Sequence, residues 1–173
     1  MEQGRKYTFS WNHIGDIADG RPNLGNTASV EAYRLMQFSC RDVMEQYLGA
    51  EKTDELFYQA GKLAGKEFYN HMLTPTKDFN EFLRQLQLAL VEMGIGILRV
   101  EKTDLENGEL VWTVSEDIDC SGLPEMDFEI CTYDEGFISS LLECYSGAPF
   151  QVKEVDCWCT GDRTCRFRAK AIK

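Results

Sequence analysis

The segment from Glu154 to Phe167 places three cysteines around a tight turn, and it constrains the fold more than any other part of the chain. Gly161 and Asp162 favour a hairpin loop there, because glycine tolerates the positive φ that such loops need. A three-residue loop would make Cys157 and Cys165 direct partners across two antiparallel strands, with Cβ atoms about 4.5 to 5.5 Å apart. Thiolates at this separation chelate a borderline-soft ion such as zinc, so the segment predicts a metal site on a β-hairpin.

The other cysteines divide into two that can join this site and three that fit a structural role. Cys131 ends a predicted strand that can lie beside the hairpin. Cys159 shares a strand face with Cys157, so we interpret it as a competing ligand or as a reactive thiol beside the metal. Three further cysteines stand alone among apolar or loop residues, where free cysteine behaves as a small buried hydrophobe, and we assign them no function: Cys40, Cys120 and Cys144.

Glu154 has two interpretations on local geometry alone. Residues three apart on a regular strand face opposite sides, so Glu154 joins Cys157 only if the strand bulges between them. Without a bulge, the same register places Glu154 opposite Arg168 as an ordinary surface ion pair, which local geometry favours. The two histidines do not extend the site, because His13 lies in an irregular N-terminal region and His71 lies at a predicted helix C-terminus.

Composition limits the classes of function. The chain has 173 residues, of which 43% are hydrophobic, enough for one substantial core in a single domain. Its 29 acidic and 18 basic residues give a net charge of −11, which repels nucleic acid and anionic membrane surfaces. There is no apolar run of membrane-spanning length, and the polar start lacks a following secretory apolar region. We therefore expect a cytoplasmic protein that binds neither nucleic acid nor membranes.

Hydrophobic periodicity predicts helices followed by a β-rich half. Apolar residues recur at helical spacing over residues 28–48, 54–72, 78–93 and 134–145. Strand patterns and turn residues occupy 95–101, 109–115, 128–132, 150–159 and 164–172. Alternating aromatic residues from Tyr7 to Trp11 predict a further short strand in an N-terminal extension, residues 1–27. The order predicts an α+β fold, with an N-terminal helical layer packed on an antiparallel sheet and a C-terminal zinc-bound β-hairpin.

Two glycines, Gly61 and Gly65, stand four residues apart on the second predicted helix. They leave a smooth strip where another backbone can approach closely. The strip can seat another helix of the same chain or a second subunit. Together with the aromatic N-terminal strand, it favours a homodimer.

The motifs of the C-terminal half resemble the signature of the 4-vinyl reductase domain family: Cys131-Thr-Tyr-Asp-Glu-Gly, Glu154-x-x-Cys157, Gly161-Asp162 and Cys165-Arg166-Phe167. That family includes a protein linked to bacteriochlorophyll synthesis and the ligand-sensing domains of phenol- and xylene-responsive transcription activators. It is structurally related to trafficking subunits of the TRAPP complex. In the aromatic-sensing members, three cysteines and one glutamate hold zinc. The resemblance therefore implies the zinc ligands Cys131, Glu154, Cys157 and Cys165, and it reverses the local interpretation of Glu154.

The resemblance also implies an apolar ligand pocket within residues 28–173 and a tendency to dimerise. Candidate walls are the inward apolar side chains of the predicted helices and strands: Phe57, Phe68, Met72, Phe79, Phe82, Met93, Trp112 and Phe137. Unlike the phenol sensors, this chain has no histidine in the central pocket-lining region. It also lacks their ATPase and DNA-binding domains.

We therefore expect a stand-alone sensor or carrier domain that contains zinc and binds a small apolar or aromatic ligand. One alternative is an enzyme or accessory protein acting on a tetrapyrrole or other vinyl-bearing compound, with Cys159 or a replaceable Glu154 supplying the chemistry. The sequence shows no recognisable acid and base pair or nucleotide site, which disfavours this alternative. The other alternative is a structural scaffold without a ligand.

Overall fold

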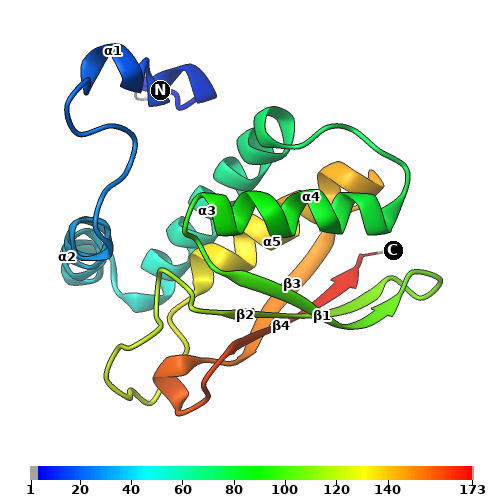
Figure 1. The fold of residues 1–173 in the computed structure, drawn as a ribbon. Coiled ribbons are helices and arrows are strands. Elements are labelled where there is room, and N and C mark those ends of the chain that lie inside the picture. The colour runs from blue at the N-terminus through cyan, green and yellow to red at the C-terminus, as the bar shows by residue number, and fades with distance from the viewer. Residues whose placement is uncertain (1–3, 173) are drawn as a thin grey trace.

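The computed structural model describes residues 4–172. The elements follow in the order η1 (Trp11–Ile14), α1 (Ile17–Gly20), α2 (Val30–Leu48), α3 (Ala50–Met72), α4 (Phe79–Glu92), β1 (Ile97–Asp104), β2 (Glu109–Ser115), α5 (Thr132–Ser146), β3 (Phe150–Asp156), η2 (Trp158–Thr160) and β4 (Cys165–Ala171). Helices α3, α4 and α5 lie on one side of the sheet, while α2 and the N-terminal segment lie towards one end of it (Figure 1). The predicted α+β class is confirmed.

The four strands form one antiparallel sheet in the order β1-β2-β4-β3. The strand predicted over residues 128–132 is wrong, because this segment is a loop that leads into α5. Its backbone is bound by a side chain instead of a neighbouring strand, since the amide of Cys131 donates a hydrogen bond to Glu154. Cys131 is thereby fixed at the N-terminus of α5.

The main core lies between α4, α5 and the sheet. Helix α4 begins at Asp78, whose carboxylate accepts hydrogen bonds from the amides of Asn80 and Glu81, and it buries a stripe of leucine and phenylalanine side chains. Trp112 and Phe167, on the sheet, are each 1% exposed. The helical stripe and the alternating strand residues therefore meet as their periodicities predict.

Helices α3 and α5 pack unusually closely. A Cβ atom on Gly61 would overlap the carbonyl oxygen of Tyr133, and one on Gly65 would lie 2.5 Å from the carbonyl oxygen of Phe137. A Cβ on Gly136 would likewise overlap a carbonyl oxygen of α3. The glycine strip therefore seats a helix of the same chain, which was one of the two expected roles, and it gives no support to a dimer.

The N-terminal strand predicted from Tyr7 to Trp11 is also wrong. Residues 7–10 have no strand structure, and Trp11 begins the short helix η1. The Trp11 ring stacks on His71 with centroids 4.9 Å apart, and its amide donates a 2.6 Å hydrogen bond to Glu67. The aromatic residues of this segment are thus not in a sheet, and Trp11 instead attaches the segment to the C-terminal end of α3. Among residues 4–172, no helix combines the length and apolar character needed to cross a membrane.

Candidate metal centre

Four buried thiols converge at the end of the sheet, with every sulfur atom within 4.8 Å of the others: Cys120, Cys131, Cys157 and Cys165. Cys120 Sγ lies 3.0 Å from Cys165 Sγ, and Cys131 Sγ lies 3.9 Å from both Cys157 Sγ and Cys165 Sγ. Zinc–thiolate bonds of about 2.3 Å in a tetrahedron place sulfurs roughly 3.8 Å apart. The cluster therefore has the spacing that a metal ion needs.

The hairpin supplies two of these thiols. The last residue pair between β3 and β4 is Asp156 with Arg166, so Cys157 and Cys165 follow on either side of the connection. The connection is longer than the predicted three-residue loop, because β3 ends at Asp156 and η2 occupies residues 158–160. Gly161 nevertheless has the expected positive φ of 99°. Proximity of Cys157 and Cys165 thus survives the change of loop.

Cys120 comes from the loop after β2, and the sequence analysis assigned it no function. Arg34 of α2 holds this loop through hydrogen bonds to the carbonyl oxygens of Asp117, Ile118 and Ser121. The loop lies beside the hairpin because Val114, near the end of β2, pairs with Cys165. Only that register, which no local pattern reveals, brings Cys120 to the cluster.

Glu154 reaches the cluster through a strand irregularity. The β3–β4 register shifts between Glu154 and Asp156, which is the bulge that a role beside Cys157 requires. Glu154 lies opposite Phe167 and is 1% exposed, so the surface ion pair with Arg168 favoured by local geometry is wrong. Its Oε2 accepts a 3.2 Å hydrogen bond from the amide of Cys131.

The other carboxylate oxygen, Glu154 Oε1, is buried without a hydrogen-bond partner. Burial, followed by the charge of Cys157, raises the pKa of Glu154 to about 9. Hydrogen bonds from Cys120, and then from Cys131 and Cys165, hold the pKa of the Cys157 thiol low. A bound cation would satisfy the orphaned oxygen and deprotonate the cluster, so the donors fit zinc chemically.

Cys159 is buried but lies outside the group of four convergent thiols. Burial, followed by the charge of Cys157, raises the pKa of the Cys159 thiol to about 12. Reactive cysteines have lowered pKa values and are accessible, so these features oppose a reactive role. The Cys159 carbonyl oxygen instead accepts a 2.6 Å hydrogen bond from the amide of Met126.

The predicted pocket residues are distributed over several places. A cavity of about 30 Å³ between α4, α5 and the sheet is lined by Trp112, Phe137 and nine others, and it has room for about one water molecule. A separate groove of about 300 Å³ involves α2, α3 and Tyr133 and is lined in part by Phe57. The remaining predicted residues line neither space; Phe68, Phe79 and Phe82 are buried core residues, Met72 is partly buried and Met93 is 48% exposed.

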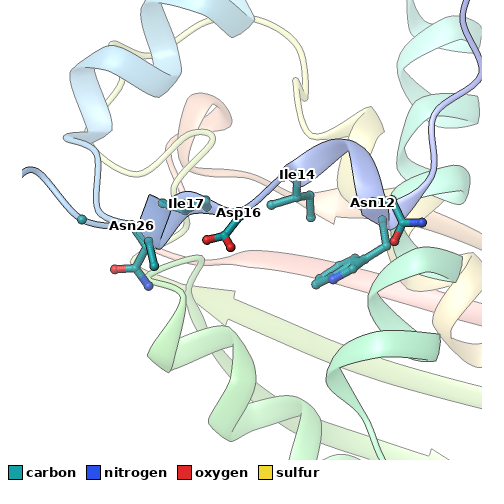
Figure 2. A pocket seen from close by; sticks show the side chains of 9 residues that line it. Asn12, Ile14, Asp16, Ile17 and Asn26 are labelled. Atoms are coloured by element: carbon teal, nitrogen blue, oxygen red, sulfur yellow. The ribbon is translucent and has the colours of Figure 1, made fainter. Parts of the chain in front are cut away.

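A wider hollow of about 890 Å³ is formed within the N-terminal segment. Figure 2 shows Asn12, Ile14, Asp16, Ile17 and Asn26 around it. None of its lining residues is buried, and no candidate metal ligand is among them. It contributes nothing to the metal centre.

These features define an α+β domain in which helices cover one face of an antiparallel sheet and a thiolate cluster lies at its end. Residues 110–171, which span β2 to β4 and contain all four converging cysteines, match the 4-vinyl reductase domain. The resemblance to the 4-vinyl reductase domain family is therefore confirmed over this part of the chain.

Solved structures share the fold. The phenol-responsive sensory domain of the transcription activator PoxR, bound to phenol, superposes with a TM-score of 0.64 at 14% identity, covering 83% of this chain and 75% of that one. A vinyl-4-reductase family protein from Methanocaldococcus jannaschii gives 0.64 at 17% identity, covering 98% and 100%. Subunit 3 of the trafficking protein particle complex from Naegleria fowleri, covalently bound to palmitic acid, gives 0.66 at 11% identity, covering 83% and 95%.

Proposed function

We propose that this chain is a zinc-containing module that binds a small apolar or aromatic molecule, with residues 28–173 as the binding domain. The convergence of buried thiols and Glu154 at one end of the sheet carries the metal part of this proposal. The match to the 4-vinyl reductase domain and the fold shared with a phenol sensor support the ligand-binding part.

The proposed zinc ligands are Cys131, Glu154, Cys157 and Cys165. Glu154 supports this set through its buried, unpartnered oxygen. Cys120 competes for the fourth position, because its sulfur also lies within 4.8 Å of the other three. Four anionic ligands close a tetrahedron and leave no position for a reactive water, so this ion has a structural role.

Cobalt substitution tests the ligand set, because thiolate–cobalt bonds absorb strongly in the near ultraviolet. Cys157→Ser and Cys165→Ser should each weaken this absorption and reduce zinc retention, whereas Cys40→Ser, at an exposed site, should change neither. Comparing Glu154→Gln with Cys120→Ser then identifies the fourth ligand, since only loss of a ligand should lower zinc affinity substantially. Full zinc retention in Cys165→Ser would reject the site.

We further propose that the ligand enters the apolar space between α4, α5 and the sheet, where Trp112 Nε1 is a buried donor without an acceptor. The present cavity of about 30 Å³ is too small for an aromatic molecule, so uptake requires α4 to move away from the sheet. The groove of about 300 Å³ lined by Phe57 and Ala60 is the competing location.

Native mass spectrometry of gently purified protein tests whether a small molecule is retained. Phe82→Trp should block uptake into the core while sparing zinc, because Phe82 is 2% exposed and its ring stacks on Tyr145 with centroids 4.6 Å apart. Ala60→Trp should block uptake only if the groove is the site. Absence of any bound molecule, before or after exposure to an aromatic and fatty-acid panel, would leave a scaffold. Cofactor-like absorbance of the purified protein would instead favour the enzyme alternative.

We also propose a homodimer in the cytoplasm. The support for a dimer is the set of large apolar side chains exposed on α2: Leu35, Met36, Val43, Tyr47 and Leu48. The support for the compartment is the free state of the buried cysteines, which a reducing environment maintains. Light scattering that returns about 20 kDa at micromolar concentrations would reject the dimer.

A further inference from the structure

A second group of potential metal ligands adjoins the thiolate cluster. One carboxylate oxygen each from Asp117 and Asp134 lies within 4.8 Å of the other and of Cys131 Sγ. Asp117 follows β2 and is 4% exposed, while Asp134 lies in the first turn of α5. Asp134 Oδ2 is buried and has no hydrogen-bond partner. Cys131 therefore belongs to two convergent sets of donors.

The charge of these carboxyl groups is not balanced by protein. Among residues 4–172, no lysine or arginine forms an ion pair with Asp117 or Asp134. Arg34 bonds the backbone carbonyl of Asp117 rather than its carboxylate, and Arg41 pairs with residues of α2 and α3. Two neighbouring carboxyl groups in an apolar interior are costly unless they share protons or bind a cation. One zinc ion among the thiolates leaves this pair without a ligand of its own.

The cavity beside the two carboxyl groups supplies an independent indication. Asp117 and Asp134 both line the cavity of about 30 Å³, which has the volume of about one water molecule. Trp112 lines the same cavity, is 1% exposed, and has no acceptor for its Nε1–H. An indole donor, two carboxylates and a thiolate thus surround a space otherwise bounded by apolar side chains.

We propose that Asp117, Asp134 and Cys131 bind a second divalent metal ion, with the Cys131 thiolate bridging it to the zinc of the cysteine cluster. A water molecule in the cavity completes four ligands and accepts the Trp112 hydrogen bond. Mixed carboxylate and thiolate donors suit zinc, cobalt(II) or iron(II). Three protein ligands and one water make an open site, unlike the closed site beside it. The water position faces the apolar cavity, so the oxygen of an incoming molecule can replace it.

This inference rests on the zinc site proposed above for its bridging thiolate, and a metal titration separates the two. Metal-free, reduced protein is titrated with cobalt(II) while near-ultraviolet and visible absorption are recorded. We expect two equivalents per chain: one with intense thiolate charge transfer, and one that mainly alters the weaker visible bands. Asp117→Asn with Asp134→Asn should remove only the equivalent with weak bands. Asp127→Asn, at an exposed position, is the matched control and should retain both.

Elemental analysis after zinc loading and desalting should give two ions per chain for the parent and one for the double variant. Asp134→Asn alone, which keeps the size of the side chain, should weaken the second equivalent at least tenfold while circular dichroism remains that of the parent. A parent that binds one equivalent, or a double variant that retains two, would overturn the second site and leave the thiolate site intact. Binding of no cobalt by the parent would reject both sites.

Discussion

Replacing Gly61 with alanine tests how closely α3 and α5 must approach. The new Cβ would overlap the carbonyl oxygen of Tyr133 and lie 2.9 Å from the amide nitrogen of Phe137, so backbone must shift rather than a flexible side chain. Overpacking of this kind costs about 1 to 3 kcal/mol, and a clash with backbone on two sides places Gly61→Ala near the upper value. Alanine returns about 1 kcal/mol of helix propensity. The expected net loss of unfolding free energy is about 2 kcal/mol.

A loss of that size lowers the melting temperature of a chain this long by roughly 4 to 8 °C. Thermal unfolding followed by circular dichroism, with zinc present in excess, measures it. Gly20→Ala is the control, because its Cβ would meet nothing within 4 Å and Gly20 does not have a positive φ. Tyr133 is two residues from Cys131, so the displaced α5 should also lower zinc affinity. A Gly61→Ala variant as stable as the parent, or more stable, would refute the close packing of these helices.

Three further outcomes are expected. Removing zinc with a chelator, or introducing Cys165→Ser, should lower metal content and melting temperature together, because binding at a structural site is coupled to folding; separate responses in elemental analysis and thermal unfolding would argue against this. Metal-free reduced protein should lose stability as pH rises from about 5 to 8, because burial raises the pKa of Glu154 to about 9 and of Asp117 to about 7, so the folded state holds protons that the unfolded chain has released. Zinc-loaded protein should show the opposite trend in the same denaturant titrations, since ligation requires deprotonated donors. An equal slope with and without zinc would contradict the role of these groups.

Much of the architecture follows from local patterns. The helical stripes predicted α2, α3, α4 and α5 to within a few residues, because burial of one helix face imposes a period that survives any tertiary arrangement. The strands β1 to β4 also lie where alternation and turn residues placed them. The segments 7–11 and 128–132 failed for a common reason: a strand needs a partner, and neither segment has one among the described residues.

The candidate site shows the same division. Sequence alone brought Cys157 and Cys165 together, because a short connection between antiparallel strands leaves their positions little freedom. Only the tertiary structure decided that Glu154 turns inward at a bulge, and that Cys120 and Asp117 arrive from a loop held by Arg34. Those residues are brought to the site by strand register and by packing between distant segments, and such contacts depend on the whole fold rather than on neighbours in the sequence.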